Sequence, residues 1–345
     1  MKIDSAYIEI TNACNINCKT CYNRSGTNTS RQEISFVQLQ DAILKLMELG
    51  AKQFIFAGGE PTLHSQFEQI LDLVKIYPDY HFCISTNGTV HNQKLIDIYN
   101  TVHNFNVQIS LDGSCEEVNS ITRGKGNFQR TLEFLHKLDP VKKKLRVKMV
   151  ISKNNLFDVE SFYRMVVSLG GVPEFAFVNK QGNAITHWDE MGISLEGKFA
   201  VIRVINKLNS ELSIKALLPL CTSKCPLSGK SPNLAATIKV DGIIMPCQLL
   251  YDNHFMLGNI FYLDKTNFED RLNYVSSLVE ARETTDYGCN RCIIRSYCKK
   301  GCMALAFNMT GNSLSCDGEC DFRKLQFIRL DLEKRARGLI KSAAD

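Results

Sequence analysis

Three cysteines lie close together near the start of the chain, in the stretch TNACNINCKTCYN. They are Cys14, Cys18 and Cys21, spaced Cys-x3-Cys-x2-Cys, and the aromatic residue Tyr22 follows them. A structural zinc site usually has four ligands, often arranged in Cys-x2-Cys pairs. A triplet with no fourth ligand nearby suits a [4Fe–4S] cluster that leaves one iron open to another molecule. The spacing therefore favours an iron–sulfur cluster over a zinc knuckle.

The other cysteines also indicate metal. The chain has 14 cysteines in 345 residues, and nine of them lie within 221–320. The N-terminus has no apolar stretch of signal-peptide length and no run is long enough to cross a bilayer, so we expect a cytoplasmic protein. Thiols there are kept reduced, which makes disulfides an improbable use of clustered cysteines. Cys83 and Cys115 lie apart from both groups and are interpreted as buried or incidental thiols.

The overall composition is that of a soluble globular protein. Charged residues make up 22% of the chain and hydrophobic residues 44%. The net charge of +5 is small for this length, so it indicates neither a nucleic acid nor a membrane as a partner.

Short runs rich in β-forming residues alternate with stretches of helical periodicity through the first half of the chain. The expected strands are 6–10, 53–57, 81–85, 106–110, 145–152 and 174–178, and the expected helices are 35–50, 65–77, 92–100, 127–138 and 158–169. This alternation predicts an α/β fold with a parallel sheet and right-handed crossovers. Six strands are too few to close an eight-stranded barrel, so we expect an open, partial (β/α)6 TIM-like barrel. Its ligand site should lie at the carboxyl ends of the strands.

The pattern changes after Trp188. A helix is expected over 194–209, and Asp241-Gly242 between two β-rich runs predicts a β-hairpin. The end of the chain has the pattern of a basic amphipathic helix, whose apolar face is expected to pack on the protein rather than on a membrane. The expected parts are the barrel at 1–190, a connecting helical segment at 191–220, a small cysteine-rich domain with a hairpin and helices at 221–322, and the final helix at 323–345.

The cysteine triplet followed by an aromatic residue resembles the CxxxCxxC hallmark of the radical S-adenosylmethionine (SAM) superfamily. The resemblance implies that the open iron of the cluster binds the amino and carboxylate groups of SAM. It also implies that an electron from the reduced cluster cleaves SAM to methionine and a 5′-deoxyadenosyl radical. A flavodoxin or a ferredoxin would then be the electron donor.

Five later stretches strengthen this resemblance. Gly58, Gly59, Glu60 and Pro61 match the GGEP motif of the family, which contacts the amino group of SAM. Ser85 and Asn87, in STNG, correspond to a strand end that contacts the ribose, and Ser110 and Arg123 resemble a pair near the SAM carboxylate. Residues 178–184, VNKQGNA, resemble a segment that flanks the adenine and the substrate. Asn87-Gly88 and Asp112-Gly113 are also ordinary turn dipeptides in any protein.

The cysteines of the second half resemble the SPASM extension of radical SAM enzymes. The resemblance implies two auxiliary [4Fe–4S] clusters with interleaved ligands. The first would be held by Cys221, Cys225, Cys247 and Cys302, and the second by Cys289, Cys292, Cys298 and Cys316. Cys320 competes with Cys316 for the last position. Structural zinc is the alternative for this region.

For the reaction, the resemblance favours the modification of a ribosomally synthesised peptide by crosslinking, epimerisation or oxidation. The stretch RGKGNFQR at 123–130 is similar to that of peptide maturases, while Gln248 stands where sulfatase maturases carry an Asp. The expected barrel begins at residue 6, so leader recognition would need a separate protein or the barrel itself. The alternatives are a radical SAM dehydrogenase or epimerase of a sugar or aminocyclitol, and a non-catalytic binding protein stapled by metal. No residue is assigned as the hydrogen donor or acceptor.

Overall fold

The computed structural model describes residues 1–27, 30–141, 143, 145–216, 218–219, 225–229, 231–286 and 288–329. Cys221 and residues 330–345 of the expected final helix lie outside these ranges. The chain divides into two compact units. Unit 1 comprises Met1–Leu220 and Pro232–Asn273, and unit 2 comprises Cys221–Ser231 and Tyr274–Asp345.

Unit 1 is built on one nine-stranded sheet in the order β6-β5-β4-β3-β2-β1-β7-β8-β9. The first six strands are β1 (Lys2–Thr11), β2 (Gln53–Gly58), β3 (His81–Thr86), β4 (Phe105–Ser110), β5 (Arg146–Ile151) and β6 (Val172–Phe177). Each of them pairs in parallel with the next in sequence. The sheet ends at β6 on one side and at β9 on the other, so this is the open, partial barrel that the sequence predicts.

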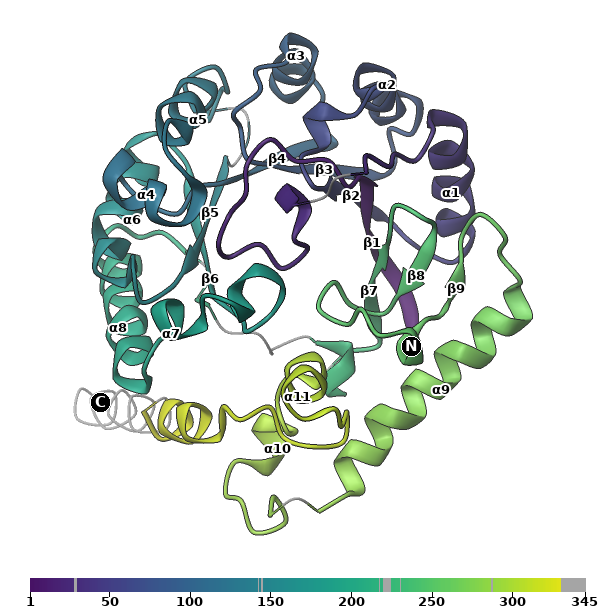
Figure 1. The fold of residues 1–345 in the computed structure, drawn as a ribbon, viewed down its shortest axis with the longest axis vertical. Coiled ribbons are helices and arrows are strands. Elements are labelled where there is room, and N and C mark those ends of the chain that lie inside the picture. The colour runs from purple at the N-terminus through teal and green to yellow at the C-terminus, as the bar shows by residue number, and fades with distance from the viewer. Residues whose placement is uncertain are drawn as a thin grey trace, which may run out of the picture. The chain divides into compact units, whose positions relative to one another are not determined.

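Helices cover the outer face of the curved sheet (Figure 1). They are α1 (Phe36–Glu48), α2 (Phe67–Ile76), α3 (Gln93–Thr101), α4 (Glu116–Arg123), α5 (Asn127–Leu135), α6 (Val159–Ser168), α7 (Trp188–Met191) and α8 (Leu195–Glu211). The predicted end signals of the first helix are present, because Ser35 forms a capping box with Gln38 and Gly50 takes a φ of 103°. Helix α4 was not expected, because its sequence EEVNSITR is short and mostly polar.

Side chains alternate between the two faces of the central strands. In β4 and β5 the residues toward the helices are apolar and buried, such as Val107, Ile109 and Val147. The residues between them are only partly buried and mostly polar, and they include Gln108 and Lys148. The apolar face therefore forms the core beneath the helices, and the polar face lines the inside of the barrel.

The predicted hairpin is present as β7 (Asn233–Ile238) and β8 (Ile243–Met245), and the short strand β9 (Gly258–Asn259) follows it. We expected the hairpin within the cysteine-rich region, but it belongs to unit 1. Strand β7 pairs in parallel with β1 along Lys2–Ile8 and continues the sheet beyond the six barrel strands. This pairing satisfies the backbone groups on the outer side of β1, which would otherwise form a sheet edge.

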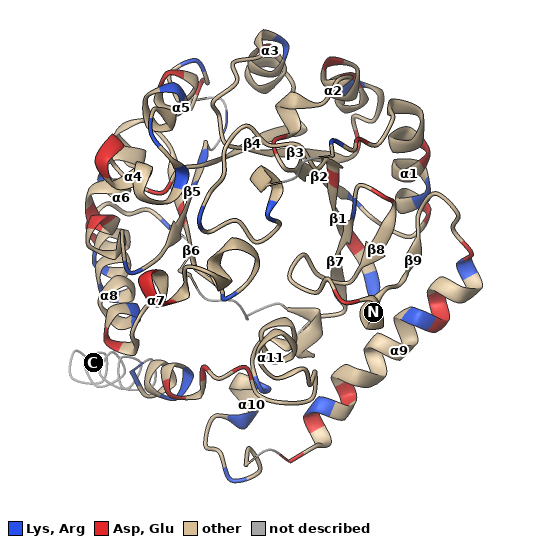
Figure 2. Ribbon diagram, viewed as in Figure 1, with Lys and Arg blue, Asp and Glu red and all other residues tan. Residues whose placement is uncertain are grey.

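Unit 2 contains the second part of α9 (Lys265–Thr284), α10 (Arg295–Cys298) and α11 (Met303–Thr310), and residues 320–329 are helical. The buried guanidinium of Arg282 connects several loops of unit 2 by hydrogen bonds. It donates to the carbonyl oxygens of Leu227, Lys300, Gly301 and Ser315 at distances of 3.0–3.5 Å. Charges of both signs are interspersed on the helices of the chain (Figure 2). No helix within the described ranges is long and apolar enough to span a bilayer.

Candidate functional site

A cavity of about 590 Å3 occupies the inside of the barrel in unit 1. It brings together most of the residues that the sequence pointed to. Its lining includes Cys14, Cys18, Cys21, Tyr22, Gly58, Gly59, Glu60, Ser85, Asn87, Ser110 and Arg123. Pro61 does not line it and instead begins the short 3-10 helix Pro61–Leu63. Residues from five separate loops and strand ends thus share one space, as expected for the carboxyl edge of a parallel sheet.

The cysteine triplet lies on the loop after β1, which crosses the centre of the barrel in Figure 1. None of the cysteines in the described part of the chain is in a disulfide. Burial raises the pKa of the Cys14 thiol to about 11 and that of Cys18 to about 12. Each of these two thiols interacts electrostatically with the other thiols of the triplet and with Arg123. Three neighbouring thiols facing a roomy cavity fit a cluster with one open iron.

One further thiol lies at this cavity, and the described residues lack the pattern of a single-ion metal site. Cys83 also lines it, although its electrostatic neighbours are Arg146 and Glu174 rather than the triplet. Among the described residues, no group of three or more Cys, His, Asp or Glu side chains is arranged to bind one metal ion. The ligands of an iron–sulfur cluster sit on separate irons and do not have to meet at one point.

The two glycines after β2 pack against the backbone of the cysteine loop. A Cβ on Gly58 would lie 2.0 Å from the carbonyl oxygen of Thr11, and one on Gly59 would lie 2.1 Å from that of Ala13. The amide of Gly59 donates to Thr11 and that of Glu60 donates to Ala13, at 2.8 and 2.7 Å. Glycine is therefore needed here because the loop that carries Cys14 lies directly on this strand end.

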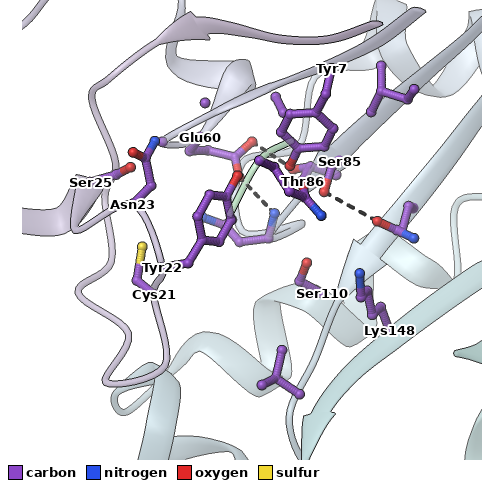
Figure 3. A pocket seen from close by; sticks show the side chains of 18 of the residues that line it. Tyr7, Cys21, Tyr22, Asn23, Ser25, Glu60, Ser85, Thr86, Ser110 and Lys148 are labelled. Atoms are coloured by element: carbon purple, nitrogen blue, oxygen red, sulfur yellow. Dashed lines mark hydrogen bonds between the residues drawn. The ribbon is translucent and has the colours of Figure 1, made fainter. Parts of the chain in front are cut away.

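Glu60 joins the ends of two strands. Its buried carboxylate accepts hydrogen bonds from the amide and hydroxyl of Thr62, from the hydroxyl of Thr86 and from the amide of Asn87, at 2.6–3.1 Å. The Asn87 side chain in turn donates to Asn15 on the cysteine loop. Burial raises the pKa of Glu60, whereas these hydrogen bonds lower it. Figure 3 shows Glu60 and Thr86 at the edge of the cavity.

Arg123, at the end of α4, is held by a buried acid. Its Nε lies 2.9 Å from Oδ2 of Asp112, whose side chain is fully buried. The remaining part of the guanidinium faces the triplet, with Nη1 4.0 Å from Sγ of Cys18. Arg123 is thus oriented by Asp112 toward a thiol, in a position to offset the negative charge of a thiolate. Ser110, the other residue that the sequence places near a carboxylate, lines the same cavity as Arg123.

Ser110 has a different cationic neighbour, which the sequence analysis missed. Lys148 on β5 is its register partner, and both side chains line the cavity, where Figure 3 shows them side by side. The neighbouring Arg146 is paired with Glu174 at 3.1 Å, and Gln108 donates to the same carboxylate at 2.6 Å. Lys148 has no ion-pair partner among the described residues. The alternation of polar and apolar residues along β4 and β5 was the signal that could have identified it.

A group of aromatic and charged side chains surrounds Tyr22, which lines the barrel cavity. Tyr22 points toward Tyr7 in Figure 3, and its ring lies 6.3 Å from that of Tyr251. The Tyr251 hydroxyl donates to Glu9 at 2.5 Å, and Nζ of Lys239 lies over the Tyr251 ring, 5.2 Å from its centroid. Burial raises the pKa of Glu9 above 4.5. These residues join β1 and the segment after the hairpin, and they support Tyr22 beside the triplet.

The segment after β6 anchors the cysteine loop. Asn179 lines the cavity. The amide of Asn183 donates to the carbonyl oxygen of Cys21, and its side chain donates to that of Cys18, both at 2.9 Å.

His64 is buried outside the cavity lining and contacts the carbonyl oxygen of Ile34. Its role in the structure is to hold the chain near α1.

The later cysteines are distributed over both units. In unit 2, a small cavity of about 30 Å3 is lined by Cys289, Cys292, Cys298, Cys316 and Cys320, together with Ile294, Arg295, Lys300 and Lys324. Cys225 and Cys302 interact electrostatically with one another in the same unit. Cys247 belongs to unit 1, and the next two residues, Gln248 and Leu249, line the barrel cavity. The expected ligand Cys221 lies outside the described residues.

Comparison with known proteins identifies a family and several relatives. Residues 8–166 match the sequence model of the Radical SAM superfamily. The chain is 27% identical over 325 residues to the mycofactocin maturase MftC of Mycolicibacterium smegmatis, covering 90% of this chain and 81% of the relative. It is 23% identical over 343 residues to an AdoMet-dependent heme synthase of Methanosarcina barkeri, covering 91% and 95%. The fold is similar to native anSMEcpe with bound AdoMet and Cp18Cys peptide, with a TM-score of 0.74 and 16% identity over 97% of this chain and 99% of that one.

Proposed function

We propose that this chain is a radical SAM enzyme that binds a [4Fe–4S] cluster on Cys14, Cys18 and Cys21 and SAM beside it. The match of residues 8–166 to the Radical SAM sequence model supports this proposal. The observation that carries this proposal is the meeting of the triplet with strand-end polar groups in one cavity of about 590 Å3. When bound, the cluster supplies the electron that cleaves SAM to methionine and a 5′-deoxyadenosyl radical, which removes a hydrogen atom from the substrate.

The protein side chains position these groups. Gly59 and Glu60 fix the loop of the triplet against the end of β2. Arg123 faces Cys18 and offsets the charge of the bound thiolates. Ser110 and Lys148 together offer a hydroxyl and an ammonium group, which suit the carboxylate of SAM. In this arrangement Lys148 takes the role that the sequence analysis assigned to Arg123.

We infer that the substrate is a ribosomally synthesised peptide. The similarity to a mycofactocin maturase over most of both chains supports this, and so does the fold shared with a structure that holds both AdoMet and a peptide. A separate leader-binding protein and an electron donor such as a flavodoxin or a ferredoxin are the proposed partners, in the cytoplasm. The auxiliary cysteines are proposed to hold two further [4Fe–4S] clusters that accept the electron left on the product.

A second candidate is an iron porphyrin or a related tetrapyrrole as the substrate. It is favoured by the similarity to an AdoMet-dependent heme synthase, which extends over 95% of that relative. We rank it below the peptide because the identity to the maturase is higher, at 27% against 23%.

The enzyme is tested by anaerobic reconstitution of the full chain, followed by addition of dithionite and SAM. We expect 5′-deoxyadenosine to form, with about 12 irons per chain if three [4Fe–4S] clusters are bound. A fully loaded chain that forms no 5′-deoxyadenosine would contradict the proposal.

The substrate class is tested by adding either a short peptide encoded beside the gene or an iron porphyrin. Mass spectrometry of the probe and the yield of 5′-deoxyadenosine are measured for each. We expect a mass change in the peptide only. A change in the porphyrin alone would favour the second candidate.

A further inference from the structure

Unit 2 holds one more thiol around its small cavity than a cluster needs. Four thiolates complete the ligation of a [4Fe–4S] cluster. Five cysteines line this cavity, namely Cys289, Cys292, Cys298, Cys316 and Cys320. The sequence left Cys316 and Cys320 as competitors for one ligand position, and in the structure both of them line this cavity.

The surroundings of the cavity suit an anionic cluster. Arg295, Lys300 and Lys324 also line it. Nη1 of the buried Arg323 lies 4.0 Å from Sγ of Cys298. A [4Fe–4S] cluster with four thiolate ligands carries net negative charge, and cationic neighbours stabilise thiolates. The residues present therefore fit the group that the proposed function requires.

The two competing cysteines differ in how their backbones are held. Cys316 precedes Asp317, whose buried carboxylate pairs with Arg323 and accepts a hydrogen bond from the amide of Cys302 at 2.8 Å. Cys320 lies four residues further on, where the helical segment 320–329 begins. The Cys320 thiol nevertheless lines the same cavity as the Cys316 thiol.

We propose that Cys316 and Cys320 are interchangeable fourth ligands of one auxiliary cluster, for which Cys289, Cys292 and Cys298 are fixed ligands. In the exchange, the iron–sulfur bond to one cysteine breaks as the bond to the other forms. The entering thiol loses a proton, the released thiolate takes one up, and no electron is transferred. This inference rests on the auxiliary cluster of the proposed function. Its consequence is a cluster that stays fully ligated by protein when one of the two thiols is lost.

The test is the iron content of reconstituted full-length variants, together with the EPR spectrum of the reduced protein. We expect Cys316→Ala and Cys320→Ala each to keep the wild-type number of irons. The double variant should lose about four irons per chain, as should the control Cys298→Ala. The two single variants should differ in their EPR signals, because a different sulfur completes the cluster in each.

A single variant that loses as many irons as Cys298→Ala would overturn the exchange and identify one fixed ligand. A double variant that keeps all its irons would also overturn it. If Cys298→Ala itself loses no iron, the auxiliary cluster of the proposed function is wrong, which is a distinct result. Thermal melting of each variant separates loss of iron from loss of folding.

Alkylation of the loaded wild-type protein gives a second measurement that does not depend on any substitution. We expect about one equivalent of label shared between Cys316 and Cys320, and label on both after the iron is removed. Complete labelling of one cysteine and none of the other in the loaded protein would contradict the exchange.

Discussion

The two cysteine-lined cavities of this protein differ in size, in ligand number and in surroundings. The cavity of unit 1 measures about 590 Å3, and that of unit 2 about 30 Å3. The first presents the triplet among polar groups from several strand ends, whereas the second presents five cysteines and three cationic side chains in a tight space. A site short of one protein ligand and with room beside it can admit a small molecule. A site with more thiols than one [4Fe–4S] cluster needs and little open space beside them suits a cluster held by protein ligands alone.

The largest loss of activity is expected from removing a cluster ligand in the cavity of unit 1, which we call the roomy site. Cys18→Ala should reduce the formation of 5′-deoxyadenosine below detection, because the cluster that cleaves SAM loses a ligand. About four irons should be lost, and the irons of unit 2 should remain. Iron analysis and chromatography of the products measure both effects. Cys115→Ala is the matched control and should behave as the wild type; surviving activity in Cys18→Ala would refute the assignment.

The small cavity of unit 2, which we call the tight site, is expected to depend for its stability on the ion pair between Asp317 and Arg323. Asp317→Asn should destabilise unit 2 by about 3–5 kcal/mol, because it leaves the buried Arg323 without its partner. The irons of unit 2 should be lost at a lower temperature than those on the triplet. Iron retention and circular dichroism during heating measure this difference. Asp321→Asn is the control, because Asp321 is exposed and pairs only with Lys324 at 3.9 Å.

A smaller effect is expected at the carboxylate position of the roomy site. Lys148→Met should raise the Kd for SAM about tenfold, equivalent to about 1.4 kcal/mol, since an ammonium partner of the carboxylate is removed. Equilibrium dialysis of the loaded protein with labelled SAM measures it. The exposed Lys153→Met serves as the control. If the Kd for SAM is unchanged in Lys148→Met and increased in Arg123→Lys, then Arg123 rather than Lys148 binds the SAM carboxylate.

The smallest effect concerns the buried acid on β1. Because folding raises the pKa of Glu9, the folded state keeps a proton that the unfolded chain has lost. Stability from this group is fully present below pH 4.5 and is lost as the pH rises through the raised pKa. Glu9→Gln should therefore lessen the fall in Tm between pH 5 and pH 8, by about 2–4 °C for each kcal/mol. Glu48 is exposed, so Glu48→Gln should leave the dependence of Tm on pH unchanged. If Glu9→Gln also has the wild-type dependence, the pKa of Glu9 is not raised by folding.

The barrel could be predicted closely because local patterns specify its elements. The six expected strands and five expected helices are present with small shifts at their ends. Ser35 and Gly50 mark the limits of α1 through backbone geometry that depends on few residues. The position of β7 beside β1 could not be predicted in this way. It depends on which strand edge the folded sheet leaves open, and Lys2 and Asn233 become partners only through that pairing.

The sequence alone determined the cysteine triplet, the strand-end motifs and the resemblance to the radical SAM superfamily, whose sequence model matches residues 8–166. These are properties of residue type and spacing along the chain. Only the tertiary structure decided that Arg123 is held by Asp112, that Lys148 stands beside Ser110, and that Cys316 and Cys320 share a cavity. Each of these depends on contacts between elements that are separate in sequence. The register of strands and the direction of side chains set such contacts, and both are fixed only when the chain packs.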